Sequence, residues 1–196
     1  MKLLEERILK DGVVLPGDIL KIDSFLNHQI DGELIEEVGK EFYRLFKDVN
    51  PDKILTIESS GLVLAYATSI CFGHIPIVFA KKTYSSNTGA DVYSVLEHSY
   101  TRNVDYEVQV AKQYLSKKER VLIIDDFLAK GEALNALINI CKQAECEVVG
   151  CGVVVSKTYQ EGEERIRKLL GYDVKVLAKV KALYDDGRIE IEKQDV

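Results

Sequence analysis

The segment that decides the fold class spans residues 121–133 and reads VLIIDDFLAKGEA. Its apolar start, with Arg120 before it, predicts a buried strand of a parallel sheet at Arg120–Ile124, and two adjacent carboxylates, Asp125 and Asp126, follow. Gly131 allows a tight turn before an expected helix at Glu132–Gln143. The first N–H groups of a helix have no partner within the helix, so such a turn favours an anion. The segment therefore predicts a phosphate site beside two acids.

Strand and helix patterns alternate on both sides of this segment. We expect further buried strands at Lys53–Ile57, Pro76–Ala80 and Val148–Val155, and helices at Asp31–Phe46, Leu62–Phe72 and Glu161–Leu170. This alternation indicates the α/β class, with a parallel sheet covered by helices on both faces. Ligands bind beyond the carboxyl ends of parallel strands. The polar residues that end the strands, 58–61, 81–82, 125–126 and 156–157, should therefore meet on one rim.

Two regions depart from this alternation. Residues 91–110 alternate apolar and polar side chains and predict a half-exposed hairpin, while residues 82–89 before it are typical of an irregular, mobile loop. Together they occupy the position of a lid. Residues 13–29 fit no crossover unit and are expected to cap the sheet. We expect one domain over residues 1–196, with a hood formed mainly by about residues 13–30 and the C-terminal segment.

Composition excludes several classes of protein. The chain has 196 residues, 46% of them hydrophobic, and a formal net charge of −6, which argues against non-specific nucleic-acid binding. The charged N-terminus predicts no signal peptide and no stretch predicts a membrane span, so we expect a cytoplasmic protein. The four cysteines, Cys71, Cys141, Cys146 and Cys151, fit neither a zinc site nor a disulfide framework.

Other interpretations of the acid pair are weaker. Adjacent aspartates at a strand end are sometimes only caps of the next helix. A phospho-receiver domain needs an acceptor aspartate on a later strand, and Val148–Val155 contains none. A dinucleotide-binding dehydrogenase needs a GxGxxG turn, which Glu58–Gly61 does not supply.

The segment 121–133 resembles the phosphoribosyl-pyrophosphate (PRPP) signature of type I phosphoribosyltransferases. Three more segments, ILKIDSFLNHQ at 19–29, TIESSG at 56–61 and VFAKK at 78–82, resemble bacterial xanthine phosphoribosyltransferases, in the same order and over nearly the whole chain. The resemblance implies a central parallel sheet with a small hood and a flexible loop. It also implies transfer of phosphoribose from PRPP to a purine, with Mg²⁺ as cofactor, held mainly by PRPP and water, and a homodimer.

The resemblance also implies a role for each matching residue. The ribose hydroxyls would be bound by the catalytic pair Asp125 and Asp126, and the 5-phosphate by Ala129, Lys130, Gly131, Glu132 and Ala133. Pyrophosphate would be bound by Ser59, Ser60, Gly61 and either Lys81 or Lys82. Xanthine would be bound by Leu20, Asn27, Phe127 and Lys157.

Two features of the phosphate segment depart from the family pattern. Ala129 and Ala133 stand where many such enzymes have threonine, so the phosphate would be bound by backbone amides alone, and Glu132 is expected to face outward. Simpler interpretations also stay open for the purine residues. Leu20 is also typical of a core residue, and Asn27 of a turn cap. Lys157 is also typical of an exposed lysine at a strand end, and the two lysines at 81–82 of a solvated pair.

Two alternative functions remain. One is a hypoxanthine/guanine phosphoribosyltransferase, since a lysine at position 157 donates to any 6-oxopurine. The other is a PRPP-sensing regulator without catalysis, which is expected to carry an additional basic DNA-binding domain; the acidic charge and the length of this chain leave no room for one.

Overall fold

A mixed eight-stranded sheet lies at the centre of the computed structural model, which describes residues 1–83, 91–99 and 104–193. The strand order is β10-β9-β8-β7-β3-β4-β6-β5. Five neighbouring strands are parallel: β3 (Lys53–Ile57), β4 (Ile77–Thr83), β7 (Arg120–Leu128), β8 (Glu147–Lys157) and β9 (Lys175–Leu183). The edges are antiparallel: β5 (Val92–Ser99), β6 (Val104–Ala111) and β10 (Ile189–Ile191). The predicted α/β class is confirmed, although the sheet is mixed rather than purely parallel.

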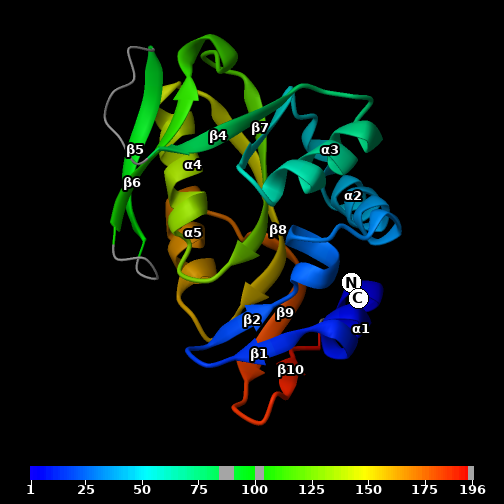
Figure 1. Ribbon diagram of the computed structural model, residues 1–196. Coiled ribbons are helices and arrows are strands. Elements are labelled where there is room, and N and C mark those ends of the chain that lie inside the picture. Colours follow the sequence, from blue (N-terminus) through cyan, green and yellow to red (C-terminus); the bar gives the residue numbers. More distant parts are fainter. Residues whose placement is uncertain (84–90, 100–103, 194–196) are drawn as a thin grey trace.

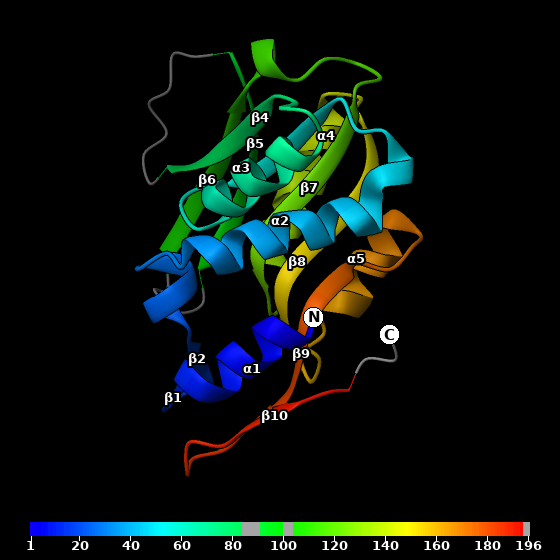
Figure 2. The same ribbon diagram turned by 90° about the vertical axis from the view of Figure 1, so that its right-hand side faces the viewer.

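Helices cover both faces of this sheet, as Figures 1 and 2 show. On one face lie α2 (Gly32–Phe46) and α3 (Gly61–Cys71), with α1 (Lys2–Asp11) against β9. On the other lie α4 (Glu132–Gln143) and α5 (Gly162–Leu170). Asp31 begins α2 as its carboxylate accepts the Leu34 N–H. Gly150 and Gly152 of β8 let α2 approach closely, because a Cβ at either would lie 2.8 Å from a phenylalanine ring of α2.

The hairpin expected at 91–110 is present as β5 and β6. It extends the main sheet, since β6 pairs with β4 at Lys81–Thr83. The prediction of a loop at 82–89 is partly wrong, because β4 continues through Thr83. Residues 84–89 lie outside the described part of the chain.

The segment expected to cap the sheet forms a small second sheet, whose buried side chains join the core on the α2 face. It contains β1 (Val13–Leu15), β2 (Ile19–Lys21) and a short π-helical turn, η1 (Asp23–Asn27). In Figure 1 this unit lies beyond the carboxyl end of β8, beside α1. We call it the N-terminal unit.

Several element boundaries differ from the sequence prediction. The strand at 120–124 is too short in the prediction, because β7 stays hydrogen-bonded to β8 as far as Leu128 and so includes both aspartates. The prediction also omits α1, β9 and β10 and the short 3₁₀ turns η2 (Lys47–Val49) and η3 (Lys112–Tyr114). No helix in the described ranges is both long enough and apolar enough to cross a membrane.

Candidate active site

The two aspartates of β7 lie in different environments. Asp125 is 2% exposed and its Oδ1 accepts the Asp126 backbone N–H at 2.9 Å. Asp126 is half-buried, and the Asn27 side-chain amide of η1 lies 3.4 Å from its Oδ2. Asp126 is therefore the more accessible carboxylate of the pair, and it connects β7 to the N-terminal unit.

Burial raises the pKa of Asp125 well above its usual value, and the adjacent Asp126 charge raises it further. The Asp126 N–H and the Lys82 ammonium act in the opposite direction. Burial has the larger effect, so Asp125 is a weaker acid than usual, and it lies beside the more accessible Asp126.

The turn after β7 leads directly into α4. Gly131 occupies the N-cap position with φ +85°, a left-handed conformation that favours glycine, and no side chain caps the first N–H groups of α4. Gly162 packs against the turn, because its N–H donates to the Ala129 carbonyl at 3.1 Å and a Cβ there would lie 2.2 Å from that oxygen. The turn is thus an open helix N-terminus on a tightly packed support, as an anion site requires.

The loop after β3 approaches the acid pair from the neighbouring strand. It contains a cis peptide bond between Glu58 and Ser59, and the Glu58 carboxylate accepts the Lys82 N–H at 3.1 Å. At Gly61 a Cβ would lie 2.0 Å from Thr56 Oγ1 and 3.3 Å from Asp125 Oδ1. Only a glycine therefore fits between this loop and the acids.

The two lysines of β4 face opposite sides of the sheet, as alternation along a strand requires. Lys82 lines a pocket of about 560 Å³ at the carboxyl ends of the strands, and its Nζ lies 5.8 Å from the Tyr106 ring centroid. Lys81 lines a separate groove, with its Nζ 5.9 Å from the Phe79 ring centroid. Of the two predicted pyrophosphate lysines, the structure brings only Lys82 into this pocket.

The same pocket continues toward the N-terminal unit. Lys157, at the end of β8, is 7% exposed, and its Nζ lies 5.8 Å from the Phe127 ring centroid and donates to the Asp18 carbonyl. The solvated-lysine interpretation of Lys157 is therefore wrong. Leu20 is 8% exposed and also lines the pocket, so it serves the core and the site together.

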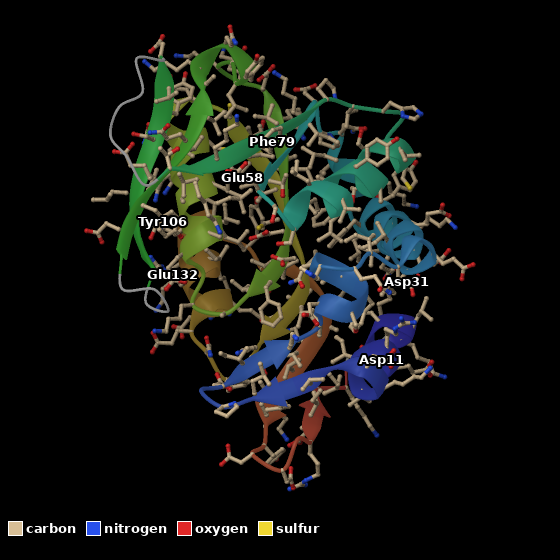
Figure 3. All side chains as sticks on the ribbon, viewed as in Figure 1. Asp11, Asp31, Glu58, Phe79, Tyr106 and Glu132 are labelled. Atoms are coloured by element: carbon tan, nitrogen blue, oxygen red, sulfur yellow. The ribbon has the colours of Figure 1, made fainter. Side chains whose placement is uncertain are left out.

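Half of the predicted site residues line this one pocket, and the two aspartates are not among them. The pocket is lined by predicted residues, namely Leu20, Lys82, Phe127, Ala129, Lys130, Glu132, Ala133 and Lys157. Glu132 is half-buried and belongs to the lining (Figure 3), and the expected outward direction of its side chain stays a prediction. Ser59 is exposed and Ser60 half-buried at the end of β3.

Sequence reasoning missed five other lining residues, Gly17, Asp18, Ile19, Tyr106 and Gln160. Tyr106 comes from the hairpin (Figure 3), Ile19 is the first residue of β2, and the other three come from turns. The sequence signal nearest to them is the Gly17-Asp18 turn pair. This pair predicts a turn, but it does not predict which other part of the chain the turn contacts.

The cysteines are not part of this pocket. All four are free thiols, and burial raises the pKa of Cys146 to about 11. Within the described residues, no group of three or more His, Cys, Asp or Glu side chains is arranged to hold a metal ion.

Comparison with known proteins agrees with this geometry. The chain matches the phosphoribosyl transferase domain family over residues 22–179. It belongs to the phosphoribosyltransferase family. Within the family it groups with proteins named xanthine phosphoribosyltransferase: it is 51% identical to the one from Finegoldia magna, covering 96% of this chain and 98% of that protein. It is 46% identical to the one from Pediococcus pentosaceus, covering 98% and 100%.

Solved phosphoribosyltransferases share the fold at lower sequence identity. Adenine phosphoribosyltransferase from Trypanosoma brucei, in complex with AMP, pyrophosphate and ribose-5-phosphate, has a TM-score of 0.73 at 17% identity, covering 94% of this chain and 83% of that one. The Giardia lamblia enzyme with 9-deazaadenine has a TM-score of 0.70 at 21% identity, covering 87% and 93%. These likenesses establish the type I phosphoribosyltransferase fold.

Proposed function

We propose that this phosphoribosyltransferase transfers the 5-phosphoribosyl group of PRPP to xanthine in purine salvage, giving xanthosine 5'-monophosphate and pyrophosphate. One observation carries the proposal: a single pocket joins an open helix N-terminus to a buried lysine that lies beside an aromatic ring. The first feature suits a phosphate and the second suits an oxopurine. The relatives named xanthine phosphoribosyltransferase support the choice of base.

On the donor side, the turn from Ala129 to Ala133 is proposed to bind the 5-phosphate through the first N–H groups of α4. Alanine at both ends of the turn offers no hydroxyl, so backbone amides and the helix dipole supply the binding. Asp126 is proposed to accept hydrogen bonds from the ribose hydroxyls, with Asp125 behind it. Ser59, Ser60 and Gly61 are proposed to bind the pyrophosphate through their loop, with Lys82 neutralising its charge.

The donor set also fits Mg²⁺. The carboxylate of Asp126 is a hard oxygen ligand that is open to solvent, and Mg²⁺ favours one or two carboxylates together with phosphate oxygens and water. We propose that Mg²⁺ binds mainly through PRPP and water, next to Asp126. When bound, it neutralises charge on the departing pyrophosphate.

On the acceptor side, Phe127 is proposed to stack on the purine and Lys157 to donate to its 6-oxo group. An ammonium only donates, so it favours xanthine, guanine and hypoxanthine over adenine, which has an amino group at that position. Asn27 is proposed to donate its amide toward the 2-oxo group, the feature that distinguishes xanthine from the other two bases.

The chemistry needs no covalent nucleophile. As the bond to pyrophosphate breaks, negative charge grows on the leaving group and the ribose becomes cation-like. Lys82 stabilises the first charge and Asp126 lies beside the second. The remaining contribution is to hold the purine nitrogen in line with the sugar, which is a matter of position.

A direct assay tests the proposal. The purified chain is incubated with PRPP, Mg²⁺ and one purine at a time, and nucleotide and pyrophosphate are quantified. Preferred conversion of xanthine is expected. Preferred conversion of hypoxanthine or guanine would assign the first alternative, and PRPP binding without turnover of any purine would assign the regulator. A homodimer stays a prediction from the resemblance, and a cytoplasmic location stays a prediction from the sequence.

A further inference from the structure

The turn between β1 and β2 has an unusual backbone. Leu15 pairs with Ile19, which leaves residues 16–18 as a tight connection, and both Gly17 and Asp18 have positive φ values of +84° and +62°. Glycine adopts this left-handed conformation without cost, and aspartate tolerates it better than most residues. Glycine would adopt the backbone conformation of position 18 equally well, so the turn itself does not require the carboxylate of Asp18.

The Asp18 carboxylate is held by the turn that follows β8. The Tyr159 hydroxyl donates to its Oδ1 at 2.6 Å, and the Gln160 side-chain amide donates to its Oδ2 at 2.7 Å. Burial and the hydrogen bond to Asp18 raise the pKa of the Tyr159 hydroxyl, so this hydroxyl stays protonated and donates at neutral pH. The carboxylate thus fixes the turn to residues 141 and 142 positions away in the chain.

This attachment determines what Lys157 meets. The Lys157 ammonium donates to the Asp18 backbone carbonyl and, in a longer hydrogen bond of 3.5 Å, to the Asp18 carboxylate. An ammonium carries three hydrogens, so two bonds to Asp18 leave one for another acceptor. With Phe127 on another side, the geometry restricts where that hydrogen points.

We infer that Asp18 is a positioning residue for the purine: its carboxylate holds the β1–β2 turn on the end of β8, and its carbonyl directs the Lys157 ammonium into the base side of the pocket. The inference rests on the proposed function. It assigns a specificity role to a residue that contributes through its backbone oxygen, with its side chain serving as the anchor.

Two substitutions separate the anchor from the carbonyl. Asp18→Gly keeps both the left-handed backbone and the carbonyl but removes the anchor, while Asp18→Asn keeps a hydrogen-bonding side chain without the charge. We expect Asp18→Gly to raise KM for xanthine about tenfold, with KM for PRPP unchanged and kcat within about twofold. Asp18→Asn should recover most of this loss. Asp185→Gly, in the exposed β9–β10 turn, is the matched control and should change neither constant.

A double-mutant cycle tests whether Asp18 acts through Lys157. In a Lys157→Met background, Asp18→Gly should cause no further rise in KM for the base. Fully additive effects would overturn the inference, because they would show that Asp18 acts independently of Lys157. An unchanged KM for xanthine in Asp18→Gly would overturn it as well.

The proposed function itself is tested separately, by measuring whether the unsubstituted chain converts any purine. If that chain converts no purine, the same cycle is measured by urea unfolding, where coupling between Asp18 and Lys157 is still expected. Independent effects on unfolding would then contradict the inference by themselves.

Discussion

The two sides of the pocket are built in opposite ways. The side proposed to bind the 5-phosphate, called the phosphate side below, comes from one continuous stretch: Asp125 and Asp126 lie on β7, and the residues from Ala129 to Ala133 turn into α4. The base side is assembled from distant segments, since Lys157 at the end of β8 meets Asp18 of the N-terminal unit 139 positions earlier. Phe127 belongs to both sides because it follows the acid pair directly and its ring faces Lys157.

This difference indicates how the two sides can vary. A continuous strand–turn–helix unit is held by its own backbone hydrogen bonds and by packing on α5, so its geometry depends little on the rest of the chain. The base side depends on one turn holding its place on a strand from the other end of the sequence. We therefore expect substitutions on the phosphate side to affect every purine equally, and those on the base side to discriminate between bases.

The largest effect is expected at Asp126, on the phosphate side. Asp126→Asn keeps the shape but removes the charge that accepts the ribose hydroxyls, so kcat/KM should fall about 100-fold, or about 2.7 kcal/mol, for xanthine, guanine and hypoxanthine alike. Steady-state kinetics with each base measures this. Asp185→Asn, on an exposed turn, is the control and should retain full activity. A loss confined to one base would place Asp126 on the base side and contradict the division of the pocket into two sides.

Substitution of Lys157 should give the next largest effect, and a selective one. Lys157→Ala removes a charged donor and should weaken the use of 6-oxopurines by about 1.5–3 kcal/mol, with KM for PRPP nearly constant. Kinetics with each base at saturating PRPP measures the change. Lys175→Ala, an exposed lysine of the neighbouring strand, should be silent. An unchanged specificity constant for xanthine would remove Lys157 from the site.

The two lysines of β4 offer a matched pair for the pyrophosphate position. Lys82→Ala should lower kcat/KM for PRPP about tenfold, about 1.4 kcal/mol, since Lys82 lines the pocket, whereas Lys81→Ala should leave it unchanged. Kinetics at varied PRPP concentration measures both variants. Equal losses would mean that charge near the site matters more than position, and a loss at Lys81 alone would contradict the assignment.

The sequence predicted the strand and the helix of the phosphate side well because their signal is local. Four apolar residues, two acids and a glycine before a helix determine both the element type and the position of the acids, and β7 and α4 follow that pattern. It did not resolve which lysine of the pair at 81–82 enters the pocket. The predicted strand ended at Ala80, while pairing with β6 carries β4 through Thr83 and fixes the alternation.

The base side was less predictable because no local pattern encodes it. Lys157 has the appearance of an exposed lysine at a strand end, and only the N-terminal unit folding over β8 buries it. The missed helix α1 has only two buried side chains, Leu4 and Ile8, which is too short a stripe to stand out. Contacts between residues so far apart in the chain depend on tertiary packing rather than on propensity.

The smallest expected effect concerns stability, and it separates the two aspartates of β7. Burial raises the pKa of Asp125 in the folded state above its unfolded value, so the folded state binds the proton more tightly. Stability therefore falls as pH rises from about 4, the unfolded carboxyl range, through the raised folded pKa. Asp125→Asn removes this dependence while keeping the shape. Urea unfolding at pH 5 and pH 8 measures it: the variant should gain stability relative to the unsubstituted chain as pH rises. If the free energy of unfolding changed with pH in the same way in both proteins, ionisation of Asp125 would cost little in the folded state. The two aspartates would then not differ in how readily they ionise.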